Sequence, residues 1–179
     1  MYYCMKINPL PFLLFLFYTS LCSSQIDTIK EARIVFKLPN NNWSFYERQQ
    51  PDTNLIGYAY VHSQVIDSNW HSTVPNIAVI IHRLSDSVTS MDFALWVIGS
   101  GKLHVIDMLP AAEKLPNLKR YSGAVFKCSD TISGLEHIVY IAFLKEKRKG
   151  VEIAIDVKSE FFDRFAKEFD AIFKSVKEI

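Results

Sequence analysis

The segment Val151 to Lys158 (VEIAIDVK), followed by the Phe-rich segment 159–176, decides the fold. In the first part a branched apolar residue occupies every second position, which is the period of a strand with one buried face. In the second part apolar residues recur every three or four positions, as in an amphipathic helix. They are Phe161, Phe162, Phe165, Phe169, Ile172, Phe173 and Val176. The sequence therefore predicts a strand that leads into a helix lying on a sheet, with Ser159 as the helix cap.

Two more strands are expected directly before this segment. Tyr121 to Cys128 and His137 to Leu144 are mostly apolar, and the charged segment Lys145 to Gly150 is typical of a hairpin turn. Because strands joined by short turns run antiparallel, this part of the chain predicts an antiparallel sheet.

The N-terminal half adds further strands. Ala32 to Leu38 alternates apolar and polar residues and is stopped by Pro39, and strands are also expected at Trp43 to Tyr46 and at Leu55 to Ile66. Ile77 to Ile81 is a continuous apolar run, which is typical of a strand that is covered on both faces.

One internal helix is expected at Thr89 to Ile98. Thr89 and Asp92 have the spacing of a capping box, and Gly99 is placed to end the helix. Because Phe93 to Ile98 is apolar on all sides, a strand remains an alternative there. Residues 103–118 favour neither structure.

Residues 1–24 differ in composition from the rest of the chain. Lys6 is the only charge before Gln25, an apolar run covers Leu10 to Tyr18, and small and polar residues follow at 19–24. This order predicts a secretory signal peptide. The run is too short for a transmembrane helix, which needs about 20 apolar residues. We therefore expect one domain at 25–179 in a periplasmic or secreted protein.

Cys22 gives an alternative, in which the leader ends at a lipidated cysteine and anchors an envelope lipoprotein. Leu21 departs from the small residue that such sites carry before the cysteine. Cys4 also lies in the leader, so Cys128 is the one cysteine that certainly remains in the domain, and its apolar context favours a small buried residue over a reactive thiol.

Composition excludes some classes of protein. The chain has 179 residues, 49% of them apolar, with 20 Lys and Arg against 19 Asp and Glu. That apolar share is typical of a globular domain and argues against disorder. The net charge of +1 gives no basic surface of the kind that nucleic-acid binding needs.

The order of elements resembles that of PsbP/Mog1-like domains. The resemblance is carried by Phe36-Lys37-Leu38-Pro39 with Trp43 four residues later, by a middle helix after a branched strand, and by a final helix ending in Ile172 to Val176. It implies an α+β fold, a mostly antiparallel sheet with flanking helices in an αβα sandwich. Members of this fold serve as photosystem accessory subunits, a Ran-binding factor and envelope lipoproteins, so the resemblance does not assign a function.

No catalytic or metal-binding motif is found. The five histidines lack ligand spacing, and Gly99-Ser100-Gly101 is too short for a nucleophile elbow, so we expect no cofactor and name no catalytic, cofactor-binding or metal residue. His62 and His82 are interpreted as structural. His71 lies beside Trp70 in a loop, where the pair is interpreted as a folded-over apolar plug. The histidines are His62, His71, His82, His104 and His137.

Two charged groups are also interpreted as structural. Glu152 and Asp156 share a strand face with Ala154, which favours a solvent-exposed face over acid–base chemistry. The basic residues of the predicted hairpin could meet acidic lipid or a protein, but are typical of a solvated strand end. These basic residues are Lys145, Lys147, Arg148 and Lys149.

Three hypotheses of function follow. The first is an exported, non-enzymatic binding or accessory module with a protein partner in the envelope or outside the cell. The second is a small hydrolase or ligand-binding enzyme that uses His71 or His104 with a carboxylate brought close by folding. The third is an envelope lipoprotein anchored at Cys22, which is the one case in which membrane contact is expected.

Overall fold

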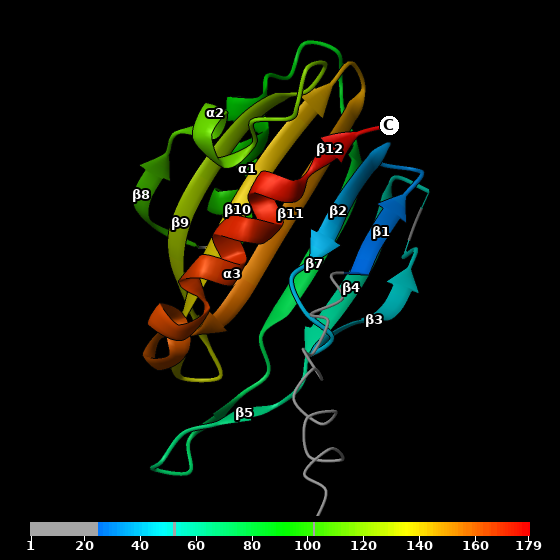
Figure 1. Ribbon diagram of the computed structural model, residues 1–179. Coiled ribbons are helices and arrows are strands. Elements are labelled where there is room, and N and C mark those ends of the chain that lie inside the picture. The colour runs from blue at the N-terminus through cyan, green and yellow to red at the C-terminus, as the bar shows by residue number, and fades with distance from the viewer. Residues whose placement is uncertain (1–24, 52, 102) are drawn as a thin grey trace, which may run out of the picture.

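The computed structural model describes residues 25–51, 53–101 and 103–179. Its main element is a seven-stranded antiparallel sheet with the order β3-β4-β7-β11-β10-β9-β8. Figure 1 shows these strands side by side. These strands are β3 (Trp43–Gln49), β4 (Leu55–His62), β7 (Asn76–Arg83), β8 (His104–Leu109), β9 (Ser122–Ile132), β10 (Leu135–Glu146) and β11 (Lys149–Lys158).

Smaller elements surround this sheet. A second sheet has the order β1-β2-β12, and a short hairpin of β5 and β6 extends away from both sheets (Figure 1). The strands are β1 (Gln25–Ile29), β2 (Ile34–Leu38), β5 (Val65–Ile66), β6 (Ser72–Thr73) and β12 (Lys177–Glu178). The helices are α1 (Ser90–Gly101), α2 (Ala111–Lys114), the 3-10 turn η1 (Ser159–Phe161) and α3 (Phe162–Ser175).

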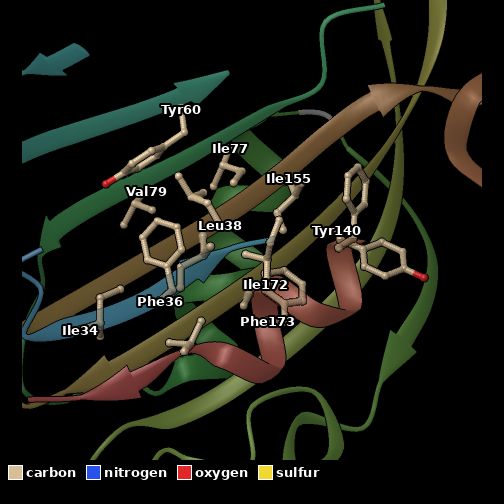
Figure 2. Close-up of a cluster of buried hydrophobic side chains, with 14 of the residues drawn as sticks. Ile34, Phe36, Leu38, Tyr60, Ile77, Val79, Tyr140, Ile155, Ile172 and Phe173 are labelled. Atoms are coloured by element: carbon tan, nitrogen blue, oxygen red, sulfur yellow. The ribbon is translucent and has the colours of Figure 1, made fainter. Parts of the chain in front are cut away.

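The first face of the large sheet is covered along most of its width. The helix α3 and the strand β2 lie in front of it (Figure 1), and their apolar side chains meet those of the sheet in one cluster. In Figure 2, Phe36 of β2 and Phe173 of α3 lie against Ile77 and Ile155 of the sheet. Phe36, Phe173, Ile77 and Ile155 are at most 1% exposed. The alternating strand and the amphipathic helix therefore bury their apolar faces against each other, as the sequence predicted.

The second face is covered by α1 and the loop before it, and only in part. Phe93, Ala94 and Ile98 of α1 pack on β9 and β10 around Cys128 and Phe143. Helices therefore lie on both faces of a mostly antiparallel sheet, which confirms the predicted α+β sandwich.

The strand at Ile77 to Ile81 corrects one expectation. Its branched run predicted cover on both faces, but β7 alternates between buried and partly exposed positions. Ile77 and Val79 are fully buried under β2 and α3, while Ala78 and Ile80 point to the second face, where α1 does not reach. Branched residues favour a strand whatever covers it, so the run could not report how many faces are buried.

Of the three predicted helix signals, one forms as expected and two do not. The capping box of α1 forms, because the Asp92 carboxylate accepts hydrogen bonds from the backbone N–H and hydroxyl of Thr89. Gly99 does not end α1, which continues to Gly101, and it keeps a φ outside the left-handed region. Ser159 does not cap α3, because it lies inside η1, and neither η1 nor α3 begins with a side-chain cap.

The sequence missed several short elements. β1 and β12 form the second sheet on either side of β2, while residues 103–118, which favoured neither structure, contain β8 and α2. The leader expected at 1–24, with Cys4 and Cys22, lies outside the described residues. Within the described residues, no helix is both long enough and apolar enough to cross a bilayer.

Candidate functional site: the open half of the sheet

The part of the second sheet face that α1 leaves uncovered is the candidate site. Its floor is made of small or apolar residues from three neighbouring strands, and all of them are partly exposed. They are Gly57 and Ala59 of β4, Ala78 and Ile80 of β7, and Ala154 of β11, which also packs against the cluster under α1. Glu47 and Gln49 of the edge strand β3 form its outer border. We call these seven residues with Trp96 of α1 the open sheet face.

Trp96 borders this face on the side of α1. It is 58% exposed, and its ring lies 5.9 Å from that of His82 on β7. The sequence places it there because α1 turns Phe93 into the core and Trp96, three positions later, to the neighbouring side of the same helix face. A large aromatic side chain is therefore held at the border of the open sheet face without being buried.

A histidine–carboxylate pair lies beneath Trp96. His82 Nε2 lies 3.0 Å from Glu152 Oε2 on the adjacent strand β11, and both side chains are about 10% exposed. The His82 ring also makes an edge contact with Phe93 at 4.9 Å. The two polar groups satisfy each other, so they can be covered by apolar rings without a large desolvation cost.

A second pair closes the opposite end of the same face. His137 Nδ1 lies 2.8 Å from Asp156 Oδ1, and the amide of Asn76 donates to the other carboxylate oxygen of Asp156 at 2.9 Å. His137 and Asp156 are 13% and 14% exposed. The Asp156 carboxylate thus accepts hydrogen bonds from residues of β7 and β10, the two strands that flank β11, and these bonds fix its position.

These contacts correct the interpretation of Glu152 and Asp156. They do share a strand face with Ala154, as expected, but that face is not open to solvent at either carboxylate. Each carboxylate is paired with a histidine from another strand instead. The sequence shows no sign of this because the partners of Glu152 and Asp156 lie 70 and 19 positions away.

The open sheet face carries two shallow hollows. One of about 150 Å³ lies over Gly57, Ala59, Ala78 and Ile80. The other, of about 350 Å³, lies between the loop before α1 and Trp96. Neither hollow is lined by a histidine.

The loop histidine is brought to a carboxylate, as the enzyme hypothesis requires. His71 Nδ1 lies 3.0 Å from Glu160 Oε2 and 3.6 Å from Asp67 Oδ2. All three side chains are at the surface, and neither His71 nor Glu160 lines either hollow of the open sheet face. Trp70 is 86% exposed at the tip of the β5–β6 hairpin, so the interpretation of Trp70 and His71 as a folded-over plug is wrong.

The other singled-out residues are structural or exposed. His62 is buried between the rings of Trp43 and Phe165, with Nδ1 2.6 Å from the carbonyl oxygen of Ser63, which confirms it as a core histidine. His104 is exposed on the edge strand β8. Cys128 is fully buried, and burial raises the pKa of its thiol to about 11, so it is the inert apolar residue that was expected.

The basic cluster of the hairpin is split by the sheet. Lys145 is 6% exposed on the second face, whereas Lys147, Arg148 and Lys149 line a separate hollow at the sheet end. Successive residues of a strand point to opposite faces, which separates Lys145 from its neighbours.

Within the described residues, no three histidine, cysteine or acidic side chains gather in a way that could hold a metal ion.

No protein-family model matches the sequence, and no curated protein matches it either. LpqN of Mycobacterium tuberculosis, which is involved in cell envelope biogenesis, is similar in structure with a TM-score of 0.55 and 13% identity, over 87% of this chain and 90% of LpqN.

Two further solved structures are similar. CyanoP, the PsbP protein of the cyanobacterium Synechocystis sp. PCC 6803, has a TM-score of 0.58 and 12% identity, over 90% of this chain and 96% of CyanoP. A protein of Bacteroides thetaiotaomicron has a TM-score of 0.52 and 11% identity, over 87% of this chain and 48% of that one. At such low identity the likeness is one of fold. The chain therefore has the PsbP/Mog1-like fold, an α+β sandwich built on an antiparallel sheet.

Proposed function

We propose that this protein is an exported accessory module that binds a protein partner through the open sheet face. The observation that carries the proposal is that α1 packs on β9 and β10 and reaches β7 at His82, which leaves Ala59, Ala78 and Ile80 partly exposed. Continuous apolar patches at a protein surface often mark sites of interaction with another protein.

A protein fits the sheet floor better than a small molecule does. The hollow over this floor holds about 150 Å³, whereas pockets that enclose a small ligand hold about 300 Å³ or more. A partner surface can instead lie flat on Ala59 and Ala78. Trp96 is the kind of exposed aromatic residue that dominates binding energy in protein interfaces, and the 350 Å³ hollow beside it can accept a side chain of the partner.

The proposed export rests on the leader sequence at residues 1–24 and agrees with the fold that the chain shares with LpqN. Mass spectrometry of the N-terminus of the protein, purified from the cells that make it, tests this part. A start at Gln25 supports release after Ser24, and a lipid on Cys22 supports an anchored module. An N-terminus at Met1 contradicts export through this leader.

Affinity capture of the tagged protein from the same cells tests the binding surface. We expect one protein to be recovered with the natural chain and to be lost with Trp96→Ala. Leu95→Ala is the matched control, because Leu95 is as exposed as Trp96 on the same helix but lines neither hollow. Recovery of the same proteins with the natural protein, with Trp96→Ala and with Leu95→Ala would contradict the proposal.

The enzyme hypothesis has one observation in its favour, the contact between His71 and Glu160. Paired groups of this type can act in acid–base catalysis when a substrate is held beside them. Because the side chains of His71 and Glu160 are 56% and 44% exposed, the contact fits a surface ion pair better. The binding module remains the function that the geometry supports best.

A further inference from the structure

A basic hollow lies at the end of the sheet where β10 turns into β11. It has a volume of about 410 Å³, and five of the six residues that line it are cationic. They come from the turn between β1 and β2, from the end of β7 and from the β10–β11 hairpin. The lining residues are Arg33, Arg83, Glu146, Lys147, Arg148 and Lys149. We call this site the basic hollow.

Few acidic groups balance these cations. Arg148 Nε donates to Asp86 at 2.9 Å, and Lys149 Nζ donates to the main-chain oxygen of Glu31 at 2.7 Å. The Glu31 carboxylate is itself paired with Arg48. Ion pairs found among the described residues include none to Arg33, Arg83 or Lys147. The basic hollow therefore keeps a surplus of positive charge.

The cations are placed against one another by the strands themselves. Lys149 lies directly opposite Arg83 in the ladder between β11 and β7. Like charges that face each other across two strands destabilise a sheet. The pKa of Lys149 is lowered, first by burial and then by the nearby charge of Arg33. The cationic side chains of the basic hollow therefore repel one another, and a bound anion would reduce this repulsion.

Two of the cations also occupy costly backbone conformations. Arg33 has a φ of 53° and Lys147 a φ of 49°, both in the left-handed region. Glycine or asparagine adopts this region with less strain than a long side chain does. At both turns a charged side chain therefore stands where local backbone energy favours glycine, which points to a role for the charge.

The geometry points to the basic hollow as a binding site for a phosphate-type oxyanion, carried either by a free phosphorylated molecule or by the headgroup of an anionic lipid. Guanidinium groups such as those of Arg33 and Arg83 match tetrahedral oxyanions with paired N–H donors, and lysine ammonium groups add charge. Alternation along β7 and β11 directs Arg83 and Lys149 to the side of α3, away from the open sheet face. The site therefore lies away from the sheet floor of the proposed protein-binding surface, although Arg83 also lines the hollow beside Trp96.

Two probes test the proposal on the protein purified in its processed form. Pyrophosphate is titrated by calorimetry, and vesicles of phosphatidylglycerol in phosphatidylcholine are tested by co-sedimentation, with pure phosphatidylcholine vesicles as reference. Pyrophosphate binding indicates a free phosphorylated ligand, and binding to the anionic vesicles alone indicates a lipid headgroup. We expect affinity for the bound probe to fall about 5-fold for each cation removed by Arg33→Gly or Lys147→Gly, and to fall with added salt.

The variants separate a binding role from a structural one. Because glycine suits the left-handed turn, Lys147→Gly should keep or raise the melting temperature while it weakens anion binding. Ser133→Gly is the matched control, since Ser133 has a φ of 53° in the β9–β10 turn and carries no charge. It should leave binding unchanged. Failure of both probes to bind, or equal binding by natural protein and Lys147→Gly, would overturn the proposal.

Discussion

His82 Nε2 and Glu152 Oε2 lie 3.0 Å apart on neighbouring strands, although 70 positions separate the two residues in the chain. The pair is covered by Phe93 and lies beside Trp96 of α1. It joins the covered half of the second sheet face to the open half, and its two side chains need each other because little water reaches either of them.

Glu152→Ala should therefore destabilise the protein. The substitution leaves the buried His82 nitrogen without its partner, which costs about 1–3 kcal/mol. Glu152→Gln keeps a hydrogen-bonding group of the same shape and should cost less. Urea unfolding at neutral pH measures both changes in the free energy of unfolding. Asp163→Ala on the exposed side of α3 is the control, and equal stability of Glu152→Ala and this control would contradict the pairing.

A second prediction compares two glycines on the second sheet face. A Cβ at Gly150 would lie 2.5 Å from Leu84 Cδ1 and 3.0 Å from Cε1 of the Phe93 ring. Leu84 can turn away, but Phe93 is fully buried and its ring cannot. Gly150→Ala should therefore cost about 1–3 kcal/mol through overpacking.

Gly57→Ala is the matched substitution on the uncovered half of the same face. A Cβ there meets nothing within 4 Å, and alanine is about 0.5–1 kcal/mol better than glycine inside a strand. We expect this variant to be as stable as the natural protein or more stable. Thermal unfolding of both variants tests the pair, and a large loss for Gly57→Ala would show that this half of the sheet is covered.

The sequence predicted the elements whose pattern is local. β11 and α3 were found because Ile153 and Ile155 follow the period of a strand and Phe165 and Phe169 that of a helix. β12 was missed because a strand of two residues has no period to detect and forms only by pairing with β2.

The candidate site could not be predicted in the same way. Which half of the sheet α1 covers depends on contacts between Phe93 and strands 30 to 50 positions later, such as those around Cys128 and Phe143. The small residues Ala59 and Ala78 carry no signal of exposure by themselves. The carboxylates of Glu152 and Asp156 were assigned to solvent because their histidine partners come from other strands. Sequence alone gives the pattern of a strand, and packing decides what meets its second face.

The last prediction concerns Glu178, whose carboxylate fixes the C-terminal end of the chain. Its Oε1 accepts hydrogen bonds from the backbone N–H groups of Lys119, Arg120 and Tyr121, and Arg120 Nε donates to Oε2 at 3.2 Å. Burial alone raises the pKa of this carboxyl, but the hydrogen bonds outweigh burial and hold the pKa below its usual value.

A carboxyl with a lowered pKa in the folded state stabilises the protein above its unfolded pKa of about 4.5. That stabilisation is lost as the pH falls through the lower, folded value. Glu178→Gln removes the charge but keeps an acceptor oxygen. We therefore expect the free energy of unfolding, measured in urea from pH 7 to pH 3, to fall less steeply with acid in this variant than in the natural protein. Glu136→Gln, on the exposed start of β10, is the control and should keep the natural slope. Parallel curves for Glu178→Gln and the natural protein would show that the contacts of Glu178 do not depend on its charge.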